Sequence, residues 1–123
     1  MSGLVVLKFG GLSVGSPERI RLAAARIAAW RSRGSQVVAV VSASGHTTDR
    51  ILSWLEAAAG PDRSGRESDK ALATGEQLSA ALVAAALSVS GQQAVSLSGA
   101  EAGLRAAGGW GEGHLCGFDE RPI

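Results

Sequence analysis

The chain has 123 residues, of which 46% are hydrophobic and 19% are charged, and its formal net charge is +1. This composition is typical of a single globular domain and excludes a disordered or collagen-like chain. The nearly balanced charge gives no overall attraction to nucleic acid or to an anionic membrane.

The cysteine content and the apolar runs indicate a compartment. One cysteine, Cys116, excludes an internal disulfide framework. The N-terminus lacks the basic flank and apolar core of a secretory signal. The most apolar stretch, Leu78 to Val89, is shorter than the ~20 residues of a membrane-spanning helix, and two serines interrupt it. We therefore expect a soluble protein in a reducing cytoplasm.

The first 41 residues predict a strand, a helix and a parallel strand. Residues 4–9 (LVVLKF) and 37–41 (VVAVV) are short aliphatic runs of the kind found in strands buried on both faces. Between them, Ser16 suits a helix N-cap, Pro17 suits the first helical position, and Gly34 ends the helix. The apolar stripe of this helix consists of Ile20, Ala24, Ile27 and Trp30.

The pattern then repeats with a polar loop and further helices. The loop at residues 42–47 leads into a helix with Thr48 as a candidate cap and Asp49 as a first-turn acid. Residues 60–65 (GPDRSG) form a surface loop. A helical pattern runs from Glu67 to Leu87, with Gly75 as a kink or a junction of two helices. Residues 93–97 predict a third strand.

The last quarter of the chain, residues 99–123, is rich in glycine and has no long periodic segment. We expect loop, hairpin or disorder there. Residues 1–123 therefore predict one partial α/β domain, a three-layer α/β/α sandwich with a mainly parallel sheet and an irregular tail. The outer edge of this small sheet would have unpaired backbone groups, ready to accept another strand from a partner or from a second copy.

The first candidate site lies at the end of the first strand, at Lys8, Gly10 and Gly11. A lysine followed by two glycines places an ammonium group beside accessible backbone N–H groups, and phosphate suits such a site. Ligands of open α/β sheets bind at the carboxyl ends of the strands. The alternative is a solvated lysine above a tight turn.

The second candidate is the loop after the second strand, at the same edge of the sheet. Its hydroxyl groups, on Ser42, Ser44, Thr47 and Thr48, are neutral groups that can hold a polar small molecule. Helix capping by Thr47 or Thr48 is the alternative. His46 is a candidate acid or base, or simply a solvated side chain.

The third candidate is Glu76, in the sequence TGEQLS, at the start of a stretch that is otherwise uncharged up to Ala100. A buried, unpaired carboxylate is costly, so Glu76 either faces solvent or pairs with a cation such as a ligand ammonium group. We expect Lys8, the two glycines, the hydroxyl-rich loop and Glu76 to share one rim of the sheet.

Four segments together resemble the ordered motifs of the N-terminal part of the aspartate kinases, in the amino-acid kinase superfamily. The resemblance spans residues 4–105, and it lies in KFGGLSV (8–14), VVSASGHTTD (40–49), TGEQLS (74–79) and SGAEAG (98–103). It implies an α/β/α sandwich that phosphorylates the side-chain carboxylate of aspartate from Mg-ATP, in amino-acid biosynthesis leading to lysine.

The resemblance also implies roles for individual residues. Lys8 would contact the transferring phosphate, with the phosphate-binding turn completed by Gly10, Gly11 and Ser13. The aspartate substrate would be held by Ser42, Thr48 and Glu76, with Glu76 paired to the substrate ammonium group. No resident metal site is expected, because His114 and Cys116 are only two of the four ligands of a structural zinc site.

Several departures from the family pattern leave a second interpretation open. Leu12 stands where the family usually has threonine, and Glu101 where it tends to have glutamine. The family's second half, which holds the nucleotide base and ribose, is not recognisable in this chain. The chain is thus expected to be an incomplete kinase lobe, which a complementing lobe would complete. The alternative is a non-catalytic remnant or binding module, and nucleic-acid binding is not expected.

Overall fold

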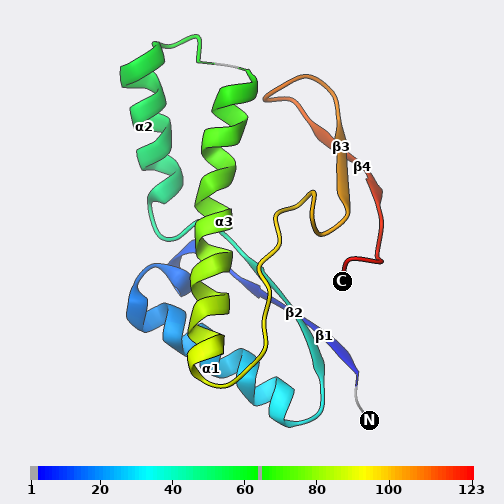
Figure 1. The fold of residues 1–123 in the computed structure, drawn as a ribbon. Coiled ribbons are helices and arrows are strands. Elements are labelled where there is room, and N and C mark those ends of the chain that lie inside the picture. Colours follow the sequence, from blue (N-terminus) through cyan, green and yellow to red (C-terminus); the bar gives the residue numbers. More distant parts are fainter. Residues whose placement is uncertain (1–2, 64) are drawn as a thin grey trace.

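A computed structural model describes residues 3–63 and 65–123 of the chain (Figure 1). The elements follow one another in the order β1 (Leu4–Phe9), η1 (Gly11–Val14), α1 (Pro17–Ser32), β2 (Gln36–Val41), α2 (Thr47–Ala59), α3 (Arg66–Val89), β3 (Leu104–Ala107) and β4 (His114–Phe118).

The β1-α1-β2 unit agrees with the prediction. β1 and β2 pair in parallel, with Lys8 opposite Val40 and Phe9 opposite Val41. Ser16 caps α1 by accepting a hydrogen bond from Arg19 N at 3.3 Å, and Pro17 occupies the first turn. These local signals are strong because each satisfies or removes a backbone N–H group that the helix cannot bond internally.

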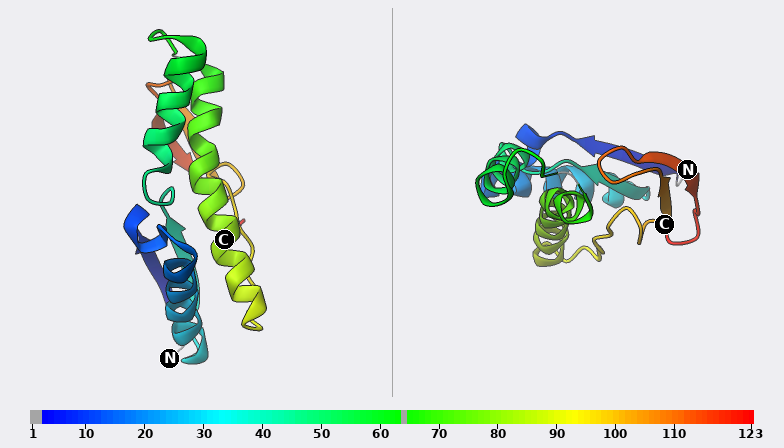
Figure 2. Two further views of the ribbon diagram at one scale, coloured as in Figure 1. Left: turned by 90° about the vertical axis from the view of Figure 1, so that its left-hand side faces the viewer. Right: turned by 90° about the horizontal axis from the view of Figure 1, so that it is seen from above.

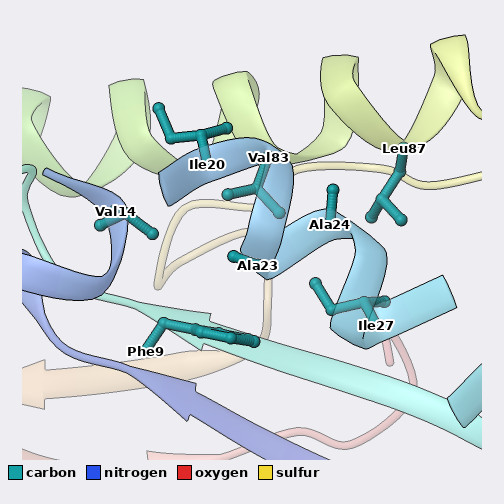
Figure 3. Close-up of a cluster of buried hydrophobic side chains, with 8 residues drawn as sticks. All are labelled: Phe9, Val14, Ile20, Ala23, Ala24, Ile27, Val83 and Leu87. Atoms are coloured by element: carbon teal, nitrogen blue, oxygen red, sulfur yellow. The ribbon is translucent and has the colours of Figure 1, made fainter. Parts of the chain in front are cut away.

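The core lies between the sheet, α1 and α3 (Figure 3). α3 contributes two apolar side chains to this core, Val83 and Leu87, which pack against the buried stripe of α1. Val14 is fully buried, so it anchors η1 and the loop after β1 to the same core. The buried residues of the cluster are Phe9, Val14, Ile20, Ala23, Ala24, Ile27, Val83 and Leu87.

Two details of the helices after β2 differ from the prediction. The N-cap of α2 is His46 and has no side-chain cap bond, so the assignment of Thr48 as the cap is wrong. Instead, the hydroxyl of Thr47 donates to the carbonyl of Ser44 at 2.6 Å. α3 runs unbroken through Gly75, which is buried within it, so this glycine is not a junction of two helices.

The predicted third strand at residues 93–97 is wrong, because the chain there is extended but pairs with no described strand. Figure 1 shows this segment as a connection that leaves the end of α3. Val95, in the middle of this segment, is 78% exposed. The glycine-rich region instead forms an antiparallel hairpin of β3 and β4, the hairpin option among the three expected there.

Among the described residues, the helices that pack against the parallel sheet, α1 and α3, lie on one face of it (Figure 2). Residues 5, 7 and 9 of β1 point toward the core, and the alternate residues point away from it. We call this second side the outer sheet face. By register it consists of Leu4, Val6, Lys8, Gln36, Val38 and Val40. Leu4 and Val6 are each 62% exposed, so β1 is not buried on both faces as its apolar sequence predicts.

By length and composition alone, α3 could cross a membrane, which corrects the expectation that no stretch is long enough. The continuous helix has 24 residues, because it extends well before the apolar run that begins at Leu78. A core helix of a soluble protein meets the same criterion, and α3 buries Val83 and Leu87 against α1. The length of α3 is therefore weak support for a membrane span.

Candidate functional site

Three segments meet at the carboxyl edge of the parallel sheet: the loop after β1, the loop after β2 and the middle of α3. The amide of Ser42 donates to the carbonyl of Phe9 at 3.0 Å, which extends the parallel pairing past the end of β2. The amide of Gly45 donates to the carbonyl of Gly11 at 3.0 Å, and the hydroxyl of Ser44 donates to the carbonyl of Val14 at 2.7 Å. The two loops are therefore fastened together.

Ala43 connects these loops to α3. Its side chain is buried, and its amide donates to Glu76 Oε1 at 3.3 Å. Gly75, the preceding residue of α3, lies so close that an added Cβ would be 2.8 Å from the Cβ of Ala43. The absence of a side chain at Gly75 therefore lets α3 approach the loop, and this approach brings Glu76 within reach of the loop backbone.

The two glycines after Lys8 differ in what surrounds them. A Cβ on Gly11 would lie 2.8 Å from the carbonyl oxygen of Ala43, so packing between the loops requires glycine there. A Cβ on Gly10 would meet nothing within 4 Å, so the space beside Gly10 is open. The N–H groups of Gly11 and Leu12 begin η1 and have no acceptor within that helix. These features fit an anion such as the phosphate of a nucleotide.

Lys8 and Glu76 approach this edge from different sides. Lys8 is exposed and belongs to the outer sheet face, whereas α3, which presents Glu76, packs on the core side. Two cavities are described, and neither is lined by Lys8 or Glu76. The described residues thus bring the backbone segments of the predicted site together, with Lys8 on the outer sheet face and Glu76 on the core side.

The predicted hydroxyl groups are spread along the same edge. Ser13 is exposed in η1, Ser42 is half-buried directly after β2, and Thr48 is exposed in the first turn of α2. His46 is 87% exposed, and its Nδ1 lies 3.3 Å from Asp49 Oδ2. Both side chains are exposed, so His46 is a solvated side chain in this arrangement, and its role as an acid or base stays a prediction.

Glu101 has a local partner. The amide of Ser98 donates to Glu101 Oε2 at 2.7 Å, and the hydroxyl of Ser98 accepts from the amide of Glu101 at 3.3 Å. This reciprocal pair has the form of a capping box in a turn rather than a helix. The hydrogen bonds from the backbone and side chain of Ser98 lower the pKa of Glu101 from its ordinary value. With Gln77 of α3, Ser98 and Glu101 line an open cavity of about 340 Å³.

Sequence reasoning missed two residues of this region, Ala43 and Gly45. The backbone N–H of Ala43 donates a hydrogen bond to Glu76, and the backbone N–H of Gly45 donates one to Gly11 in the other loop. An alanine has no polar side chain, so the only signal for Ala43 was its position between two serines. Gly45 has a φ of 53°, a conformation that favours glycine. The sequence signal for this turn was therefore the glycine itself.

A glycine turn after a parallel strand, facing a hydroxyl-rich loop, is typical of α/β domains that bind anionic small molecules at the carboxyl edge of the sheet. The family model named Amino acid kinase family matches residues 3–120. The chain therefore belongs to the amino acid kinase family, and its α/β fold is of the amino-acid-kinase type.

Curated relatives narrow this assignment. The chain is 46% identical over 117 residues to Aspartokinase 2 of Bacillus subtilis (strain 168) and 44% identical over 121 residues to the aspartokinase of Geobacillus stearothermophilus. These matches cover 95% and 98% of this chain. The crystal structure of aspartate kinase from Synechocystis matches with a TM-score of 0.71 and 43% identity over 75% of this chain. The predicted resemblance to aspartate kinases is confirmed.

The chain is much shorter than these relatives. Its matches cover 28% of the Bacillus subtilis protein and 30% of the Geobacillus stearothermophilus protein. The match to the Synechocystis structure covers 16% of that chain.

Proposed function

We propose that this chain is the aspartate- and phosphate-binding lobe of an ATP-dependent aspartate kinase, located in the cytoplasm. One observation carries the proposal: the loops after β1 and β2 and the TGE segment of α3 meet around Ala43. These are the segments that resemble aspartate kinase motifs. The similarity to aspartokinases over nearly the whole chain supports the same substrate class.

In the proposed site, the phosphate groups of Mg-ATP bind beside Lys8 and the turn formed by Gly10, Gly11 and Ser13. Open space at Gly10 and the first N–H groups of η1 suit a phosphate oxygen. In kinases, the phosphates and one or two carboxylates usually hold Mg²⁺, so this chain need not provide a complete metal cage.

The aspartate substrate binds between Ser42, Thr48 and Glu76, with its ammonium group on the carboxylate of Glu76. Glu76 Oε1 already accepts from the amide of Ala43, and this bond orients the carboxylate. The second oxygen of Glu76 is then the one proposed to accept from the ligand. An ammonium group suits it, because hydrogen bonds between ionised groups are roughly twice as strong as those between neutral groups.

The proposed reaction requires positioning more than a strong base. A side-chain carboxylate oxygen of aspartate forms a bond to the γ-phosphorus of ATP. The bond from that phosphorus to the bridging oxygen breaks, and ADP leaves with the electron pair. Lys8 stabilises the charge that spreads over the transferring oxygens. Because contacts to the nucleotide base are expected from outside this chain, we expect slow turnover by the chain alone.

Calorimetric titration of the purified chain with aspartate tests the substrate half of the proposal. We expect Glu76→Gln to abolish the binding heat while Glu67→Gln, a matched change at an exposed acid in the first turn of α3, retains it. Equal affinities for the two variants would exclude Glu76 as the ammonium partner.

Aspartate-dependent release of ADP tests the phosphate half. Any turnover should be lost in Lys8→Ala and kept in Lys70→Ala, which changes the other lysine of the chain. Leu12 is 73% exposed on η1 where the family usually has threonine, so Leu12→Thr should raise the rate or the affinity for Mg-ATP. Turnover that does not depend on Lys8 would contradict the proposed role of this residue.

A non-catalytic binding module is the second candidate. Two residues that depart from the family pattern favour a binding module. Glu101 pairs locally with Ser98, and Leu12 is exposed. Aspartate binding without Mg-ATP binding in the same titrations would support this module. Absence of both would indicate that the fold alone is kept.

A further inference from the structure

Two hydroxyl groups of the loop after β2, those of Ser44 and Thr47, have no role in the proposed function. Both residues are half-buried, and both hydroxyl groups donate to main-chain carbonyl groups. The hydroxyl of Thr47 donates within its own loop, to the carbonyl of Ser44 at 2.6 Å. The hydroxyl of Ser44 donates to the other loop, to the carbonyl of Val14 at 2.7 Å. The two hydrogen bonds are alike in chemistry and differ in what they join.

The loop after β1 depends on such bonds for its position. Its helical part, η1, has four residues, and the hydrogen bonds inside so short a 3₁₀ helix have poor geometry. The other loop holds η1 near both ends, because the amide of Gly45 donates to the carbonyl of Gly11 at 3.0 Å and the hydroxyl of Ser44 donates to that of Val14. Of these two bonds, the one from Ser44 involves a side chain and can be removed by a substitution.

Ser44 stands between the two halves of the proposed site. In the sequence it lies between Ser42 and Thr48, the hydroxyl residues of the proposed aspartate site. Its partner Val14 is fully buried in the core and directly follows Ser13 of the proposed phosphate-binding turn. Phosphoryl transfer requires the reacting atoms to be about 3–3.5 Å apart and in line. The separation of the two reactants therefore depends on how the two loops are held together.

We propose that Ser44 is a positioning residue for phosphoryl transfer, which holds the phosphate-binding turn and the aspartate-binding loop at the separation that the reaction needs. This inference rests on the proposed function, which supplies the two reactants. Ser44 acts through the carbonyl of Val14 and does not itself contact aspartate or ATP. Because a hydrogen bond to a carbonyl oxygen is directional, it fixes the orientation of the two loops as well as their distance.

Hydrogen exchange of backbone amides in the ligand-free chain tests the link between the loops. The amide of Ser13 donates to the carbonyl of Gly10 at 2.9 Å, so its exchange rate reports opening of the phosphate-binding turn. We expect Ser44→Ala to speed this exchange about fivefold, the factor that corresponds to one ordinary hydrogen bond. Thr47→Val is the matched control, because it removes a hydroxyl that bonds within its own loop, and it should leave the rate unchanged.

Two results of this experiment would overturn the proposal. The first is an exchange rate at Ser13 that Ser44→Ala does not change. The second is equal acceleration by Ser44→Ala and Thr47→Val, which would show that any lost hydroxyl of the loop loosens the turn.

Steady-state kinetics of aspartate-dependent ADP release separate positioning from substrate contact. Ser44→Ala should lower kcat by about tenfold or more and change the KM values for aspartate and Mg-ATP by less than about twofold. Ser44→Thr keeps the hydroxyl and should restore most of kcat. A raised KM for aspartate with unchanged kcat would make Ser44 a substrate contact, and a kcat of Ser44→Thr as low as that of Ser44→Ala would show that the hydroxyl is not responsible. Either result would overturn the proposal.

The two experiments also separate this inference from the proposed function. The exchange experiment contains no ligand, so it tests the link made by Ser44 even in a chain without turnover. A wild-type chain that releases no ADP, with exchange at Ser13 accelerated by Ser44→Ala alone, would contradict the proposed catalysis and support the link. Turnover that Ser44→Ala leaves unchanged would overturn the positioning role and leave the proposed function intact.

Discussion

Replacing Gly75 with alanine tests the contact on which the candidate site depends, the close approach of α3 to the loop after β2. In a helix without tertiary contacts at this position, the change should stabilise the protein by about 1 kcal/mol, because alanine has the higher helix propensity. In this structure the new Cβ would lie 2.8 Å from the Cβ of Ala43. The sign of the stability change therefore reports the contact.

The magnitude follows from the geometry. Carbon atoms in favourable contact are about 3.5–4.0 Å apart, so helix and loop must separate by roughly 1 Å. Forcing an extra methyl group into a packed site costs about 1–3 kcal/mol. After the propensity gain of about 1 kcal/mol, we expect Gly75→Ala to lower the free energy of unfolding by up to about 2 kcal/mol.

Urea denaturation followed by circular dichroism measures this, and a double-mutant cycle isolates the contact. Ala43→Gly removes the opposing methyl group, so the double variant should be more stable than the sum of the single changes predicts, by about 0.5–3 kcal/mol. Additive effects, or a Gly75→Ala variant that is more stable than the wild type, would show that α3 and the loop are not in contact.

Three further predictions concern the loops and the hairpin. Gly11→Ala should lower the free energy of unfolding in urea by about 1–3 kcal/mol, because its Cβ would lie 2.8 Å from a main-chain carbonyl oxygen, whereas Gly10→Ala, in open space, should change it little. Ser44→Ala should cost about 1 kcal/mol in the same assay, because it removes a hydrogen bond to a main-chain carbonyl of the other loop. The side-chain hydrogen bond from Arg121 lowers the pKa of Asp119, so the stability that this pair adds is present above the ordinary pKa of an aspartate and is lost as the pH falls through the lowered pKa. Amide exchange of the hairpin should show this loss in the wild type and not in Asp119→Asn.

The sequence alone determined the elements that depend on neighbouring residues. The strands at residues 4–9 and 36–41 follow from short aliphatic runs ended by glycine or polar residues. The start of α1 follows from Ser16 and Pro17, which act on the first backbone N–H groups of the helix. The motifs at the ends of the two strands also predicted which loops meet, because parallel strands end at the same edge of a sheet.

The tertiary structure decided what depends on distant residues. Residues 93–97 have the sequence of a strand and remain unpaired, because a strand forms only where another strand offers its backbone groups. Gly75 lies within a continuous helix because the packing of Ala43 against it requires a residue without a side chain. The aliphatic sequence of β1 also did not predict that only one of its faces is buried. A run of apolar residues favours burial, but it does not show which segments of the fold will pack on each face.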